Sequence, residues 1–392
     1  MGILSARLLT FLAVAAFSLP ALSLLLWTRV RGAVTLRAAQ RVGLVVTSQV
    51  LAVALAAAYV NDQYAFYVSW HDLLGKPTAP GSIVATSPLT MTGRDGAELA
   101  AGASAGSGVH AVHVTVRGAR SGLIEPVTIY LPVGYGDPRN AGVQYPVVEF
   151  LAGWHGGPES WRRALHLPAT LNAEQAAGRV QPFIAVVPTT DVALPRDVEC
   201  ADLPGVIRAE TWLTSDLRSF VTRTFRASYN GYSWGLVGYS TGAYCAAKFV
   251  LHHPTWYRSA VLMSGYYSAI RDRTTGDLWG GRHTALSHRN DPMWMLEHGN
   301  HPAVDLLAFS NTQDRESYST TLRLLQVAVP PTRTYRLIAP TGGHNLRELS
   351  AALPQLLDWL SEHLRSAQQA IVPVNPSGSR QALGQHPPAA AH

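Results

Sequence analysis

Hydrophobic residues near the N-terminus form two long stretches. Residues Leu8 to Trp27 are almost wholly apolar, and about twenty such residues in a helix cross the hydrocarbon core of a bilayer. Pro20 lies inside this stretch, but membrane helices tolerate proline. A second apolar stretch, Val42 to Val60, is interrupted by polar residues only at positions 47 to 49. We predict that residues 1–60 form a membrane anchor of two transmembrane helices. A single span and a cleaved signal peptide are the alternatives.

The charges between the two stretches predict their orientation. The connecting segment carries no acidic residue and contains the arginines Arg29, Arg31, Arg37 and Arg41. Basic loops of this kind stay in the cytoplasm. We therefore expect a protein of the cell membrane, whose N-terminus and whose chain after Val60 lie on the extracytoplasmic side.

The composition of the chain changes again on both sides of its central part. Residues 61–108 are predicted to form an aromatic segment, Asn61 to Trp70, followed by a linker rich in Gly, Ala, Ser, Thr and Pro. The aromatic residues form either a collar at the membrane interface or a surface packed on the globular domain. Residues 366–392 are predicted to be a disordered tail. One globular domain remains, at residues 109–365.

Inside this domain, short apolar runs alternate with helical patterns. Two alternating segments joined by a glycine-containing turn predict an antiparallel strand pair at the start of the sheet. Strands are predicted at 110–117, 127–131, 146–151, 183–187, 234–237, 260–263, 305–309 and 335–338, and helices at 210–225, 241–252, 317–327 and 346–364. This order predicts an α/β fold, namely a mainly parallel sheet with helices on both faces. Active sites in such sheets lie at the carboxyl ends of the strands.

Composition excludes several classes of function. The formal net charge is +6, but lysine occurs only at Lys76 and Lys248 and no basic stripe exists, so nucleic-acid binding is not expected. The two cysteines, Cys200 and Cys245, do not form a Cys-x-x-Cys pair, so a structural zinc site has no support. We expect no metal and no cofactor. In an oxidising compartment the two cysteines would pair, whereas in the cytosol they would be separate buried thiols.

The strongest catalytic motif is Gly238-Tyr239-Ser240-Thr241-Gly242, which lies between a predicted strand and a predicted helix. Gly-x-Ser-x-Gly in this context is typical of a nucleophile held on a tight, strained turn. The following helix directs the positive end of its dipole towards the place where an oxyanion would form. We predict that Ser240 is the nucleophile and that the backbone amide of Thr241 is one oxyanion donor.

A serine hydroxyl needs a general base, and in this fold the acid and the histidine follow the serine in sequence. His344 lies in Thr341-Gly342-Gly343-His344-Asn345, directly after the last predicted strand, and is predicted to be the base. The acid is expected in the loop after strand 305–309, as Asp314 or alternatively as Glu316. His283, His288, His298 and His301 lie in an irregular stretch that we predict to be a loop or lid.

A second oxyanion donor is expected after the strand that ends at Leu151. The sequence there is Ala152-Gly153-Trp154-His155-Gly156-Gly157, and its glycines allow the backbone to turn its amides inward. Trp154 is the predicted donor, with Gly153 or His155 as alternatives.

These motifs together resemble an esterase family of α/β-hydrolases that includes esterase D, feruloyl esterases and the antigen 85 mycolyltransferases. The resemblance extends from about Val127 to Leu364, and rests on Tyr130-Leu131-Pro132, the loop from Leu151 to Gly157, the Ser240 motif and Gly342-Gly343-His344. The segment Asn61 to Trp70 behind hydrophobic helices is similar to membrane-anchored actinobacterial members. This chain departs from the family pattern at Ala152, where many of the family's esterases carry His or Asp.

The prediction is a serine esterase that cleaves carboxylic esters through an acyl-enzyme on Ser240. With a sugar or lipid hydroxyl in place of water, the same residues would make an envelope acyltransferase. Acylated lipids or glycans are the expected substrates at that location. A non-catalytic binding protein of the same fold is the alternative from a different class. The sequence does not determine the oligomeric state.

Overall fold

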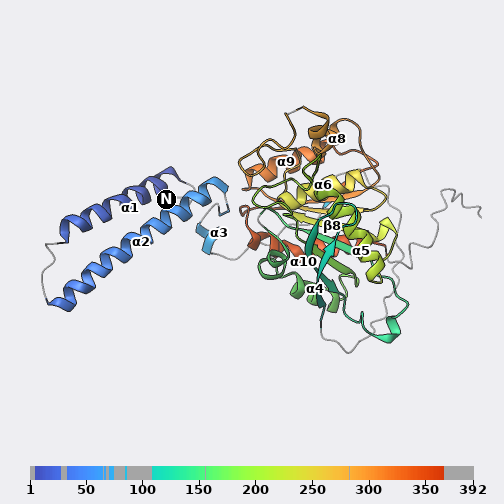
Figure 1. Cartoon of the computed structure of the whole chain (residues 1–392), viewed down its shortest axis with the longest axis horizontal. Coiled ribbons are helices and arrows are strands. Elements are labelled where there is room, and N and C mark those ends of the chain that lie inside the picture. The colour runs from blue at the N-terminus through green and yellow to red at the C-terminus, as the bar shows by residue number, and fades with distance from the viewer. Residues whose placement is uncertain are drawn as a thin grey trace, which may run out of the picture.

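The computed structural model describes residues 5–27, 33–64, 66–67, 70–74, 84–85, 108–154, 156–281 and 283–365. Two parts are visible in Figure 1, a pair of long helices near the N-terminus and a layered α/β domain. The predicted tail at 366–392 lies outside the described residues, as does most of the predicted linker.

The two long helices lie side by side as a hairpin (Figure 1). They are α1 (Ala6–Leu26) and α2 (Val34–Tyr64). Each contains a segment long and apolar enough to cross a membrane, Ala6–Leu25 and Val34–Asp62, of which only 6% and 0% is buried inside the protein. Helices of this hydrophobicity in a soluble core would be buried. Length, composition and exposure are those of a membrane anchor or a signal sequence.

Polar groups in this hairpin are bonded locally. The hydroxyls of Thr47 and Ser48 donate to carbonyl oxygens four residues earlier in α2, which satisfies them without water. Where the two helices connect, the guanidinium of Arg41 donates to the carbonyl of Trp27 and lies 4.7 Å from the centroid of its ring. These contacts hold the two helix ends together.

The α/β domain is built on one sheet whose strand order is β1-β11-β10-β9-β8-β4-β5-β3-β2. The pairs between β11 and β5 in this order are parallel, and those of β1 with β11, β3 with β5 and β2 with β3 are antiparallel. The strands are β1 (Val84–Ala85), β2 (His110–Arg117), β3 (Ile124–Leu131), β4 (Val147–Leu151), β5 (Ile184–Pro188), β8 (Trp234–Tyr239), β9 (Ser259–Met263), β10 (Asp305–Asn311) and β11 (Arg333–Ala339). A separate ribbon pairs β6 (Asp202–Leu203) with β7 (Ile207–Arg208).

Helices cover both faces of the sheet, because neighbouring strand residues point to opposite sides. Val147 faces a core that includes α5, α6, α8 and α9, whereas Val148 faces a core that includes α4 and α10. Figure 1 shows α6, α8 and α9 on one side and α4 and α10 on the other. The helices are α3 (Trp70–Leu74), α4 (Leu167–Ala176), α5 (Leu217–Thr224), α6 (Thr241–His252), α7 (Ala285–Arg289), α8 (Pro292–Glu297), α9 (Arg315–Val327) and α10 (Leu346–His363).

The predicted α/β architecture and its opening antiparallel pair are confirmed, and four details differ. The segment predicted as one helix at 210–225 begins as a π-helical turn, Thr211–Asp216, before α5. The stretch predicted as a loop or lid forms α7 and α8, which Thr284 and Asp291 cap at their N-termini. Helix α4 was not predicted, and β1 pairs with β11 inside the segment predicted as a linker. Elements this short give weak periodicity, and of these elements only α7 and α8 have capping side chains that could have indicated them.

Candidate active site

The turn between β8 and α6 holds Ser240 in a strained conformation, with φ 55° and ψ −124°. Residues with side chains rarely adopt these backbone angles. Close backbone packing around the turn maintains the conformation. A Cβ atom at Gly238 would lie 2.0 Å from the carbonyl oxygen of Gly242, and one at Gly242 would lie 2.2 Å from that of Leu151. Both glycines are therefore required by contact. This explains the spacing of the motif in physical terms.

The three residues predicted as the catalytic group are brought together by the fold. His344 Nε2 lies 3.0 Å from Ser240 Oγ, and His344 Nδ1 lies 2.8 Å from Asp314 Oδ2. A carboxylate can only accept, so Nδ1 carries the proton that it shares with Asp314, and Nε2 is left to accept from the serine hydroxyl. The Asp314 side chain is 6% exposed and that of His344 is 26% exposed. Glu316 is exposed in the first turn of α9, so Asp314 is the carboxylate beside the imidazole.

The loop that carries His344 is anchored on the loop that carries Asp314. The side-chain amide of Asn311 donates to the carbonyl of Gly343 at 3.1 Å, and Gln313 Oε1 accepts from the amide of Gly342 at 3.2 Å. Gly342 has φ +105°, a conformation that favours glycine. His344 and Asp314 are thus held in place by contacts between their two loops. Nothing in the sequence pattern identified Asn311 or Gln313 for this role.

The predicted oxyanion residues lie on the two sides of Ser240. Thr241 is the first residue of α6, and the first amides of a helix have no partner within it. On the other side, a Cβ at Gly153 would lie 2.8 Å from the Cβ of Ser240, so this loop runs directly along the nucleophile. Trp154 follows Gly153 in a turn closed by a hydrogen bond from the Gly156 amide to the Gly153 carbonyl. The alternative donor His155 lies outside the described residues.

A buried polar network holds Thr241 from behind, and no sequence pattern indicated it. Thr241 Oγ1 lies 3.4 Å from Asp197 Oδ2 and 3.2 Å from the hydroxyl of Tyr266, which also donates to Glu199 Oε1 at 2.6 Å. Burial raises the pKa of both carboxyls, and that of Glu199 well above its ordinary value. The network fixes the residue next to Ser240.

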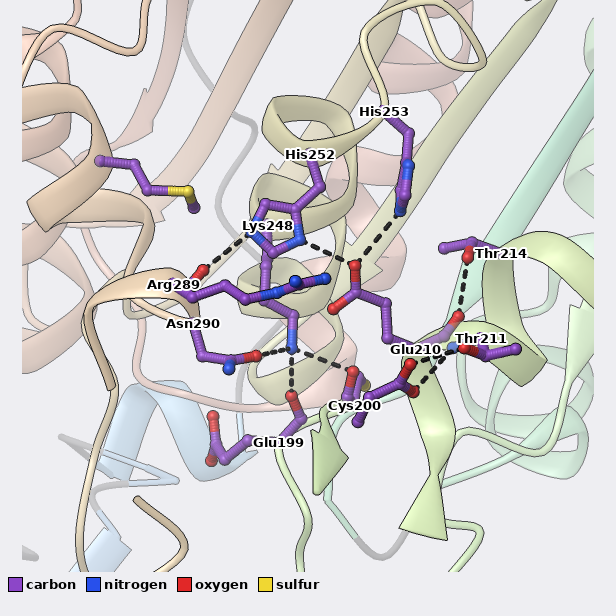
Figure 2. Close-up of polar contacts among 12 residues, drawn as sticks. Glu199, Cys200, Glu210, Thr211, Thr214, Lys248, His252, His253, Arg289 and Asn290 are labelled. Carbon is purple, nitrogen blue, oxygen red and sulfur yellow. Dashed lines mark hydrogen bonds and ion pairs between the residues drawn. The ribbon is translucent and has the colours of Figure 1, made fainter. Parts of the chain in front are cut away.

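Lys248, inside α6, fixes the loop that supplies this network (Figure 2). Its buried ammonium donates to the carbonyls of Glu199 and Cys200 and to Asn290 Oδ1, at 2.7, 2.9 and 3.0 Å. Burial lowers the pKa of Lys248 to about 8. A disulfide between Cys200 and Cys245 joins the same loop to α6. Two independent connections therefore hold the loop against α6, the helix that begins beside Ser240.

One cluster has the residue types of a metal site. Ligand atoms of Glu210, His252 and His253 lie within 4.8 Å of one another. The Glu210 carboxylate already contacts both imidazoles, at 2.7 and 3.2 Å, and the other nitrogen of His252 lies 2.8 Å from the Arg289 carbonyl (Figure 2). These contacts already satisfy the Glu210 carboxylate and both nitrogens of His252 by hydrogen bonds. The cluster lies at the end of α6 opposite to Ser240, about 18 Å away by helix rise.

Comparison with known proteins places these features in a family. Residues 125–345, more than half of the chain, match the family described as "Putative esterase". An uncharacterised protein of Corynebacterium glutamicum is 25% identical over 244 residues, a match that covers 59% of this chain and 56% of that protein. This chain therefore corresponds to little more than half the length of that relative.

Two solved structures have a similar fold. A ferulic acid esterase superposes with a TM-score of 0.55 at 17% identity, and the match covers 66% of this chain and 98% of that one. An S-formylglutathione hydrolase from Agrobacterium tumefaciens superposes with a TM-score of 0.54 at 14% identity, covering 67% and 98%. At these identities the similarity establishes the fold, which is that of the α/β-hydrolases.

Proposed function

Because this chain belongs to the esterase family and is a hydrolase of the α/β fold, we propose that it is a membrane-anchored serine esterase that acts through an acyl-enzyme on Ser240. The observation that carries the proposal is the continuous chain of hydrogen bonds from Ser240 through His344 to Asp314. It lies at the carboxyl ends of parallel strands, where sheets of this type place their active sites.

In the proposed acylation step, Ser240 Oγ attacks the ester carbonyl carbon while its proton passes to His344 Nε2. The negative charge that forms on the carbonyl oxygen is stabilised by backbone amides, for which we propose Thr241 and Trp154. The carbon–oxygen bond to the leaving group then breaks, and His344 gives its proton to the departing alkoxide. An alcohol leaves, and the acyl group stays on Ser240.

The proposed deacylation reverses these roles. Water gives a proton to His344 and attacks the acyl carbon, after which Ser240 Oγ leaves and regains the proton, and a carboxylic acid is released. Asp314 does not take a proton itself. It holds the imidazole in the tautomer that accepts at Nε2 and stabilises the imidazolium in both steps. A hydroxyl compound in place of water would receive the acyl group, so the acceptor alone distinguishes an esterase from an acyltransferase.

We also propose that the catalytic domain lies outside the cytoplasmic membrane. Two observations support this orientation: the basic segment between the apolar stretches, which favours the cytoplasm, and the disulfide between Cys200 and Cys245, a bond typical of oxidising compartments. Single cysteines placed in the exposed part of the domain of whole cells should react with a membrane-impermeant maleimide. Reaction only after the membrane is opened would place the domain inside.

The catalytic proposal is tested by labelling the full-length protein with a fluorophosphonate. Wild type should become labelled, Ser240→Ala should not, and His344→Ala should be labelled far more slowly, because the hydroxyl has lost its base. Ser319→Ala is the matched control, since Ser319 is exposed on α9 and should leave labelling unchanged. Labelling that persists in Ser240→Ala would exclude the proposed nucleophile. An unlabelled but folded wild type would favour the non-catalytic alternative.

A further inference from the structure

The aromatic segment after α2 docks on the catalytic domain beside the base. The side-chain amide of Asn345, the residue after His344, donates to the carbonyl of Phe66 at 2.8 Å. Arg347 extends the contact. Its guanidinium lies 3.4 Å from the carbonyl of Leu73 and 5.8 Å from the centroid of the Tyr67 ring. In Figure 1, α3 accordingly lies between the helix pair and the α/β domain.

The same segment is tied to the end of α2. Asn61, in the last turns of that helix, donates to the carbonyl of Tyr67 at 2.8 Å and accepts from its amide at 2.7 Å. Both bonds are to the backbone, so they fix the direction in which the chain leaves the helix. The helix pair and the His344 loop are therefore connected through one short, bonded segment.

The distance between the membrane and the catalytic residues follows from this connection. The candidate membrane span in α2 ends at Asp62, and the four residues from there to Phe66 extend over at most about 14 Å. The headgroup layer on one side of a bilayer is about 5–8 Å thick. A site attached through Asn345 thus lies at the membrane surface.

Exposed apolar side chains on the docked segment agree with that position. Phe66, Trp70 and Leu74 are 37%, 46% and 79% exposed, although the backbone around them contacts the catalytic domain. Aromatic side chains favour the interface between water and membrane. The contacts with the domain support the interpretation that the segment packs on its surface, and the exposed side chains leave its other side available to the headgroup layer.

We propose that the catalytic site opens towards the outer surface of the membrane and acts on esters carried by membrane lipids. This rests on the proposed function above, and it names the substrate class of that site. A lipid ester held in the same bilayer meets the site at a high effective concentration and need not leave the membrane. A water-soluble ester gains nothing from the short connection.

The test changes the distance between membrane and site without altering the domain. An insertion of six residues, alternating Gly and Ser, after Tyr64 would raise the domain above the membrane by up to about 20 Å. An insertion of three such residues would raise it by about half as much. A six-residue insertion after Arg31, between the apolar stretches, is the matched control because it leaves that distance unchanged. Full-length proteins are reconstituted in phosphatidylcholine–phosphatidylglycerol vesicles that contain a fluorogenic long-chain lipid ester. A soluble short-chain nitrophenyl ester is assayed in parallel.

The longer insertion should lower turnover of the vesicle-borne ester by about tenfold or more, the shorter insertion should lower it less, and the control should leave it unchanged. Hydrolysis of the soluble ester should be unchanged in all variants. In detergent micelles, where the distance no longer matters, the insertion variants should recover wild-type turnover of the lipid ester.

Wild-type turnover of the vesicle-borne ester by both insertion variants would overturn the inference. So would a wild type that prefers the soluble ester to the lipid ester in vesicles, and so would a loss that persists in micelles. These results differ from failure of the catalytic proposal itself, in which neither ester is cleaved and no fluorophosphonate label is bound.

Discussion

Replacement of Asp314 by Asn tests the arrangement of the catalytic group most directly. The contact of 2.8 Å between Asp314 Oδ2 and His344 Nδ1 is worth about 6 kcal/mol to an imidazolium at the effective dielectric constant of about 20 that suits protein sites. That energy corresponds to a rate change of about 10⁴. The same substitution in the chymotrypsin-type triad lowers kcat by a similar factor, about 10⁴. We expect Asp314→Asn to lower kcat/KM by about this amount, because an amide can present its own N–H to Nδ1 and so favour the wrong tautomer.

The assay measures kcat/KM on a soluble ester, together with the rate of fluorophosphonate labelling. Glu316→Gln is the matched control, since Glu316 is exposed two residues away on α9, and its activity should stay close to wild type. Both variants should fold, because neither changes side-chain volume appreciably. An Asp314→Asn enzyme within tenfold of wild type, or a larger loss in Glu316→Gln, would refute the assignment of the acid.

Three further predictions concern stability and the nucleophile turn. The disulfide between Cys200 and Cys245 closes a loop with a sequence separation of 45, so the double Ser variant should lose about 4 kcal/mol of unfolding free energy in denaturant titrations, and an equal stability with and without reductant would contradict this. Burial raises the pKa of Glu149 from 4.5 to about 8. The folded state therefore binds a proton that the unfolded state has lost, stability falls as pH rises through that window, and Glu149→Gln should remove a fall of about 5 kcal/mol. If the two proteins show the same dependence of melting temperature on pH, the pKa shift is absent. Gly242→Ala should abolish labelling of the serine, because its Cβ would lie 2.2 Å from the Leu151 carbonyl, and retained labelling would show that the turn can relax.

The arrangement of the sheet could be predicted because its central strands are buried on both faces and are therefore continuous apolar runs. β4, β8 and β9 are buried at every residue. The placement of Ser240, His344 and the acid loop followed from the same regularity, since each comes directly after a strand whose carboxyl end lies at one edge of the sheet. The choice between Asp314 and Glu316 could not be made, because both follow β10 and only the start of α9 determines which one turns inward.

The buried polar groups around the site could not be predicted for a different reason. Lys248 lies inside an otherwise apolar helix pattern, and its three acceptors come from two distant segments. The contact of Tyr266 with Glu199 likewise joins residues far apart in the sequence. Such contacts are satisfied only after the elements have packed, so no local periodicity indicates them. A buried ammonium needs hydrogen-bond partners, which makes an isolated lysine in a helix an indication that partners exist without showing which they are.

The loop after β11, residues 341–345, contacts both Ser240 and the segment that follows α2. Gly342 provides the backbone conformation with φ +105°, and His344 contacts both Ser240 and Asp314. Asn345 uses its two side-chain atoms separately, since Oδ1 accepts from the Glu348 amide at the start of α10 while Nδ2 donates to the Phe66 carbonyl. The group that caps the last helix thus also connects the domain to the segment that follows α2. Movement of that segment relative to the domain would act on the residue next to the base. If the helix pair spans the membrane as we propose, this loop would couple the position of the protein at the membrane to the geometry of Ser240, His344 and Asp314.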